Sequence, residues 1–103
     1  MPLNIGSIAN VIVCGEVSGS ATAKQLPTVT GGLVWIQAAA DNAGNVYVGG
    51  AGVTKPDGTT DTTTGVCLDA GDWFGPLSIA NLNMLYIICD NAGDDITYFI
   101  EQA

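Results

Sequence analysis

The chain has 103 residues, of which 48% are hydrophobic and only 12% are charged, and ten acidic residues against two lysines give a net charge of −8. This length and apolar content fit one folded domain rather than a disordered chain. With Lys24 and Lys55 as the only cations and no histidine, the composition argues against four properties: nucleic-acid binding, attraction to an anionic membrane, zinc sites built on histidine, and catalysis by a histidine base.

Short stretches rich in β-branched and aromatic residues alternate with glycine-rich turns along the whole chain. This pattern predicts one all-β domain over residues 1–103, folded as a small antiparallel β-sandwich or barrel. Period-two patterning predicts strands at residues 11–17, 33–38, 45–49, 65–68, 73–77, 84–89 and 96–100. The strand at 33–38 is expected to be central because both of its faces are apolar. Only residues 37–41 and 77–82 suit a helical turn.

An extended N-terminal arm is predicted within about residues 1–25, because residues 1–9 and 18–31 are weakly patterned. We expect the first 20 or so residues to order on docking and to pair with an exposed strand edge. Residues 55–64 contain no hydrophobic residue, so they are expected to form a polar surface loop rather than a linker between domains.

The sequence Asp-Asn-Ala-Gly occurs twice, at residues 41–44 and 90–93, each time between two predicted strands. Asn and Asp tolerate the left-handed region of backbone space and glycine adopts positive φ, so these segments suit tight loops. We therefore predict two β-hairpins, one around each Asp-Asn-Ala-Gly segment.

The acidic residues mostly stand in turns beside glycine, and none follows the spacing of an EF-hand. Three acidic pairs are therefore expected to be solvated turn residues, with incidental Ca²⁺ binding as the alternative: Asp94 with Asp95, Asp69 with Asp72, and Asp57 with Asp61. No metal site and no cofactor is predicted.

The three cysteines, Cys14, Cys67 and Cys89, are widely separated and each has apolar neighbours. We expect them to be buried, protonated and unreactive, since no histidine is available to activate a thiol. No serine triad can be built either, and the glycine-rich segment 49–52 lacks the Lys and Ser/Thr of a phosphate-binding loop. The sequence thus predicts a protein without catalytic residues.

Trp73 and Phe74 are adjacent, so in a regular strand one of them faces away from the core and can anchor an interface. The other strand aromatics are expected to pack on the sheets: Trp35, Tyr47, Tyr86 and Tyr98. The expected interface residues are Trp73, Phe74 and three apolar residues of the arm, Leu3, Ile5 and Ile8.

From Gln25 to Tyr98 the chain resembles small structural proteins of tailed bacteriophages. The segments that carry the resemblance are Gln25-Leu26-Pro27, Val34-Trp35-Ile36-Gln37-Ala38, Asn42-Ala43-Gly44-Asn45-Val46-Tyr47-Val48-Gly49, Gly52-Val53-Thr54, Gly65-Val66-Cys67-Leu68-Asp69-Ala70-Gly71-Asp72, Leu82-Asn83-Met84-Leu85-Tyr86-Ile87-Ile88 and Gly93-Asp94-Asp95-Ile96-Thr97-Tyr98. The chain departs from the pattern by a longer Thr-rich loop and by its own N-terminal sequence.

The resemblance implies a virion protein on the capsid surface, made in the host cytoplasm. Its expected function is that of a capsid cement or decoration protein, which stabilises contacts between major capsid subunits and often forms a homotrimer. The major capsid protein is then its partner, and the net charge of −8 predicts positive patches on the receiving surface.

Two other function classes remain open. One is a head-fibre or tail-associated module that binds a receptor or carbohydrate through Trp73, Tyr47 or Tyr98. The other is a Ca²⁺-dependent adhesion domain of a bacterial surface, which should carry a secretion signal. The first basic residue is Lys24, so the chain shows no charged segment of the kind that begins such a signal.

Overall fold

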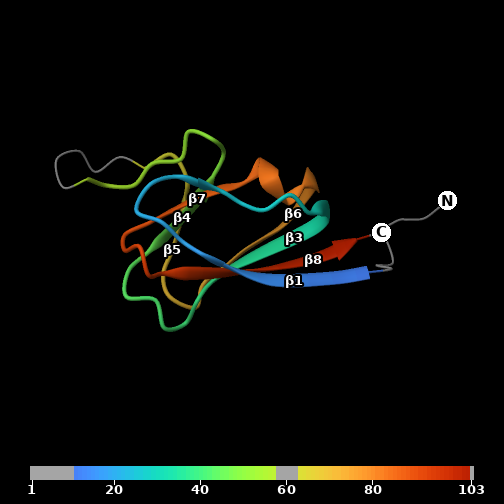
Figure 1. Ribbon diagram of the computed structural model, residues 1–103, viewed down its shortest axis with the longest axis horizontal. Coiled ribbons are helices and arrows are strands. Elements are labelled where there is room, and N and C mark those ends of the chain that lie inside the picture. Colours follow the sequence, from blue (N-terminus) through green and yellow to red (C-terminus); the bar gives the residue numbers. More distant parts are fainter. Residues whose placement is uncertain (1–10, 58–62, 103) are drawn as a thin grey trace.

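A computed structural model describes residues 11–57 and 63–102 as a β-sandwich of two four-stranded antiparallel sheets (Figure 1). Sheet A contains, in spatial order, β1 (Val11–Ser18), β8 (Asp95–Gln102), β3 (Thr30–Ala38) and β6 (Trp73–Asn81). Sheet B contains β2 (Lys24–Gln25), β7 (Tyr86–Cys89), β4 (Val46–Gly49) and β5 (Val66–Leu68). One 3₁₀ turn, η1 (Leu82–Met84), follows β6. The predicted all-β sandwich is confirmed.

The strand order follows from one long antiparallel ribbon that is rolled up. β1 pairs with β8, β2 with β7, β3 with β6 and β4 with β5. The first strand thus pairs with the last, the second with the second to last, and so on to the middle of the chain. Successive ribbon pairs then alternate between the two sheets, which gives the orders β1-β8-β3-β6 and β2-β7-β4-β5. This arrangement is the eight-stranded jelly roll, in which two sheets share one core.

The core lies between the sheets and is built from alternate residues of each strand. In β3 the inward residues Val34, Ile36 and Ala38 are fully buried, and β8 contributes Ile96 and Ile100 beside them. Sheet B and the adjoining segments close the core with a further set of buried residues: Leu26, Val46, Val48, Leu68, Leu82, Leu85, Ile87 and Cys89. Period-two placement of β-branched residues therefore produced the inner faces, as the sequence predicted. In the described ranges no helix has the length and apolar character needed to cross a membrane.

Both predicted hairpins around the Asp-Asn-Ala-Gly segments are wrong. Residues 39–45 lead from β3 in sheet A to β4 in sheet B, and residues 90–94 lead from β7 in sheet B to β8 in sheet A. Each segment is thus an arch between the sheets. The turn chemistry of Asn, Asp and Gly is local, and it suits an arch as well as a hairpin, so it does not encode which strands pair.

The two arches lie against each other and share hydrogen bonds. The carboxylate of Asp94, only 3% exposed, accepts the backbone N–H groups of Ala43 at 2.9 Å and Gly44 at 3.0 Å. The side chain of Asn42 also pairs with the backbone of Asp95, donating from Nδ2 at 2.9 Å and accepting at Oδ1 at 2.8 Å. Asp94 is therefore a buried structural residue, and the expectation that it is a solvated turn residue is wrong.

The described part of the proposed arm belongs to the sandwich. β1 pairs with β8 along its whole length, from Val11 opposite Gln102 to Ser18 opposite Asp95, and Val17 is buried in the core. The short β2 pairs with β7. The expected helical turn at residues 77–82 is also replaced, because β6 continues as a strand to Asn81 and only the 3₁₀ turn follows. Leu3, Ile5, Ile8 and Asp61 lie outside the described residues.

Candidate functional site

The outer face of sheet A carries a row of side chains that runs across its four strands. In the antiparallel register Cys14 of β1 stands opposite Phe99 of β8, and Phe99 stands opposite Trp35 of β3. On β6, Phe74 pairs with Ile36 and Leu77 pairs with Val34, so two residues, Gly75 and Pro76, stand opposite Trp35 alone. This is a β-bulge, and Gly75 occupies it with φ +119°, a conformation that favours glycine.

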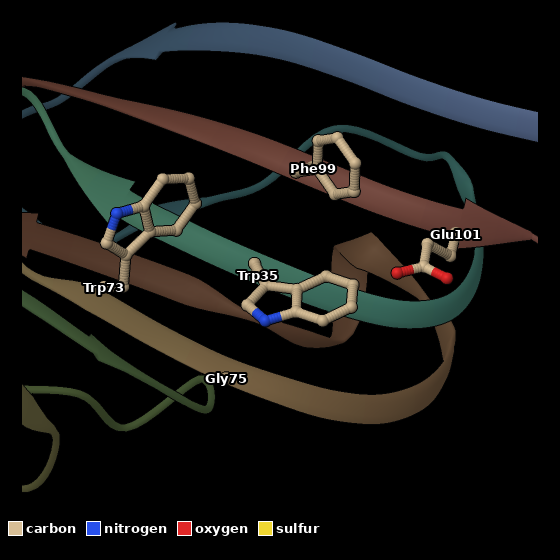
Figure 2. Close-up of a pocket in the computed structure, with 5 residues that line it drawn as sticks. All are labelled: Trp35, Trp73, Gly75, Phe99 and Glu101. Atoms are coloured by element: carbon tan, nitrogen blue, oxygen red, sulfur yellow. The ribbon is translucent and has the colours of Figure 1, made fainter. Parts of the chain in front are cut away.

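An open groove of about 430 Å³ lies on this face and is lined by Trp35, Trp73, Gly75, Phe99 and Glu101 (Figure 2). A Cβ at Gly75 would clash with the backbone oxygen of Val34, so the bulge brings the backbone of β6 close to that of β3. Figure 2 shows the Trp35 ring between Trp73 on one side and the Glu101 carboxylate on the other. We call these five residues the aromatic groove.

Two rings of the aromatic groove pack against each other, and a third remains exposed. The Trp35 and Phe99 centroids are 5.7 Å apart with the planes at 74°, an edge-to-face contact that fixes both rings. Trp73 remains 55% exposed at the start of β6. On β1, which pairs with β8, the side chain of Ile12 is 51% exposed and stands opposite Glu101. The result is an apolar surface with a single carboxylate beside its rings.

The two sheets differ in how their outer faces are covered. On sheet B, Tyr47 of β4 and Ile88 of β7 are buried beneath Val53, which lies in the segment after β4. Lys55 follows in the same segment and donates from Nζ to the backbone oxygen of Cys89 at 2.7 Å. On sheet A, the described residues provide no such cover over Trp73. The aromatic groove is therefore a surface that this part of the chain leaves open to another molecule.

The sequence located one residue of the aromatic groove and missed the rest of its side chains. Trp73 faces outward, whereas Phe74 points inward and packs against the core, so the two residues face opposite sides as their adjacency predicted. Trp35 and Phe99 were missed, although the apolar character of both faces of residues 33–38 was a signal for Trp35. Glu101 carried no signal in the sequence.

Two other aromatics that were considered for sugar binding do not lie on an open face. Tyr47 is only 5% exposed. Tyr98 alternates with Phe99 on β8 and packs against the core. Trp73 is thus the one of these three aromatics that is largely exposed.

The cysteines differ from the expectation that all three are buried. Cys89 is buried, but Cys14 and Cys67 are exposed. Burial raises the pKa of the Cys89 thiol, and the nearby Asp94 adds to this rise. The Cys67 thiol also has a raised pKa, first because its neighbours partly desolvate it and then because the Asp69 carboxylate disfavours a thiolate.

These environments predict a graded thiol reactivity. In the folded protein we expect a thiol reagent to label Cys14 and Cys67 but to leave Cys89 unmodified until the chain is unfolded. Cys67 should react more slowly than an ordinary exposed thiol at pH 8, because its raised pKa lowers the fraction of thiolate. Mass spectrometry of the labelled peptides over time checks this order. Labelling of Cys89 at the rate of Cys14 in the folded chain would contradict it.

No group of three or more His, Cys, Asp or Glu side chains suited to a metal ion occurs among the residues that the structure describes. No family model matches the sequence, and neither a curated protein nor a solved structure matches it.

Proposed function

We propose that this chain is a structural virion protein that decorates a bacteriophage capsid and stabilises contacts between major capsid subunits. One observation carries the proposal: on the outer face of sheet A the exposed Trp73 and the half-buried Trp35 and Phe99 border an open groove, whereas on sheet B Val53 covers Tyr47 and Ile88. Exposed aromatic clusters of this kind anchor protein interfaces. Docking by this face places the aromatic groove at the centre of the contact.

The fold and the sequence resemblance support the same proposed function. Jelly rolls occur in viral capsid proteins and in lectins, and although a fold does not fix a function, this one is suited to packed assemblies. An interface of about 1,600 Å² is of the size found in stable complexes. Many copies on one lattice also gain from avidity, so each contact need only be moderately strong.

The charge of the chain adds to this proposal. With a net charge of −8, the protein would be steered toward a positive patch on the capsid, and we expect association to slow as the salt concentration rises. The same charge makes the protein soluble before it docks. A homotrimer is the oligomeric state we propose, and light scattering of the purified chain measures it.

Mass spectrometry of purified particles tests the proposed function. We expect the chain in purified heads at a fixed ratio to the major capsid protein. Heads stripped of the chain should take up added chain to the same ratio and survive heating to a higher temperature once it is restored. Absence of the chain from purified particles, or a chain that remains a free monomer when mixed with stripped heads, would overturn the proposal.

Carbohydrate binding is the second candidate, favoured by the exposed indole of Trp73 and the half-buried indole of Trp35 next to a carboxylate on one face of a jelly roll. In this case the chain would sit on a head fibre or a tail and bind a receptor glycan. A glycan array with the labelled chain separates the two functions. Binding to a defined glycan, together with tail or fibre labelling in electron micrographs, would favour the second candidate, and an inactive array with uniformly labelled heads would favour the first.

A further inference from the structure

We propose that the aromatic groove binds the cationic side chain of an arginine or lysine that projects from the partner protein. The inference deepens the proposed function and rests on it for the identity of the partner, because a capsid subunit would supply the side chain. The inference specifies that the groove recognises a cationic side chain, which does not follow from the apolar character of the surface alone.

Three aromatic rings and one carboxylate gather around the same groove. The face of an indole ring carries negative electrostatic potential, so a guanidinium or ammonium group within about 6 Å of its centroid is attracted to it. Trp35 is positioned for such a contact, since it lines the open groove. Trp73 and Phe99 form the walls, and Glu101 supplies a full negative charge beside the Trp35 ring (Figure 2). Arginine suits this arrangement because its planar group stacks on rings and pairs with a carboxylate.

Within the described part of the chain, Glu101 has no cation to pair with. Its carboxylate makes no hydrogen bond and no ion pair to the residues that the structure describes, and its cross-strand neighbours are the apolar Ile12 and Leu33. The sequence has no arginine. Lys24 donates to the Ser18 backbone oxygen at 2.7 Å, and Lys55 is likewise bound to a backbone oxygen. No cation among the described residues occupies this position, so the carboxylate is available to a cation of another molecule.

The unpaired carboxylate also decides what kind of partner covers this face. An apolar partner surface seated on the groove would desolvate Glu101 without compensation, which is costly. A second copy of this chain would bring the same carboxylate and a further net charge of −8 to the contact. A partner that offers a cation satisfies both the rings and the carboxylate. Charge complementarity thus favours a basic side chain of a different protein.

The experiment uses the two tryptophans of the chain, since both lie in the aromatic groove and their indole N–H signals report on it directly. The full chain, labelled with ¹⁵N, is titrated with the capped tripeptide Gly-Arg-Gly. A matched titration uses the same peptide with citrulline, which keeps the shape of arginine but carries no charge. A third titration uses methyl glucoside as a saccharide probe.

We expect the arginine peptide to shift both indole signals in a saturable way and the citrulline peptide to bind about tenfold more weakly, because it lacks the charge that the rings and Glu101 attract. Glu101→Gln should weaken binding of the arginine peptide by about fivefold. Glu16→Gln is the matched control, since it removes one negative charge from the same outer face on β1 without lining the groove, and it should leave binding unchanged. Trp73→Phe should retain part of the binding and Trp73→Ala should lose more of it.

Equal binding of the arginine and citrulline peptides would overturn the inference, as would an equal loss in Glu101→Gln and Glu16→Gln, or shifts caused by the saccharide alone. The result is independent of the particle experiments. If heads bind the chain but the arginine peptide does not shift the indole signals, the cation site is refuted and the proposed function stands. Selective arginine binding by a chain that is absent from particles would support the cation site and refute the capsid as its partner.

Discussion

Replacing Asp94 with alanine is expected to lower the free energy of unfolding by about 3 kcal/mol, because it removes a buried carboxylate that joins the two arches. Asp94 accepts the backbone N–H groups of Ala43 and Gly44 and also, at 3.4 Å, the Nδ2 group of Asn91. A hydrogen bond to a charged group contributes about 1.5–3 kcal/mol, and the two backbone donors would be left without their acceptor. Urea unfolding followed by tryptophan fluorescence measures the loss.

Two further variants separate the hydrogen bonds from a general effect of charge. Asp94→Asn keeps the shape and one acceptor oxygen, so we expect a smaller loss of about 1–2 kcal/mol. Asp41→Ala removes the exposed acidic residue that begins the other Asp-Asn-Ala-Gly segment, whose carboxylate makes no hydrogen bond to the described residues. It should change the free energy of unfolding by less than about 0.5 kcal/mol. Equal effects of Asp94→Ala and Asp41→Ala would show that the shared hydrogen bonds do not stabilise the sandwich.

Replacing Trp73 with alanine is expected to weaken docking to stripped heads by about 30- to 1,000-fold, which corresponds to about 2–4 kcal/mol. Truncating an aromatic anchor near the centre of an interface typically reduces the binding free energy by this amount. Trp73 is 55% exposed in the free chain, so its removal should leave the fold intact and act on the bound state. Trp35→Ala should weaken docking to a similar degree but should also cost stability, since Trp35 packs edge-to-face on Phe99. Sedimentation of the chain with stripped heads measures the affinity.

Val66→Ala provides the matched control for Trp73→Ala. Val66 is also an exposed apolar side chain, at 46%, but it belongs to β5 in sheet B. If sheet A is the docking face, this substitution should leave the affinity for heads unchanged, and thermal melting of both variants verifies that they are folded. Loss of docking in Val66→Ala, with Trp73→Ala unaffected, would move the interface to sheet B.

The strands and their faces could be predicted because their signals are local. Runs of β-branched and aromatic residues at 33–38 and 96–100 predict strands, and the structure extends these to β3 and β8. The opposite orientations of Trp73 and Phe74 follow from the period of two in a strand. Each of these features depends only on the geometry of a strand, which a short segment determines by itself.

Strand pairing could not be read from the same signals. β3 pairs with β8 and β6, and residues of these pairs are far apart in the chain, as in Trp35 opposite Phe99. Two segments with the same turn sequence, at 41–44 and 90–93, were expected to close hairpins and instead cross between the sheets. A turn sequence fixes the backbone of a few residues, whereas the choice of partner strand depends on how all the apolar faces are buried together.

Local residue patterns were enough to specify an acidic all-β chain in which one of two adjacent aromatics, Trp73 and Phe74, faces away from the core. The folded arrangement, by contrast, brings Trp35, Phe99 and Glu101 together beside Trp73 around one open groove. It also decided that Asp94 is buried between two arches. These outcomes depend on register and on the rolling of the ribbon into two sheets, because both bring together residues that no local pattern connects.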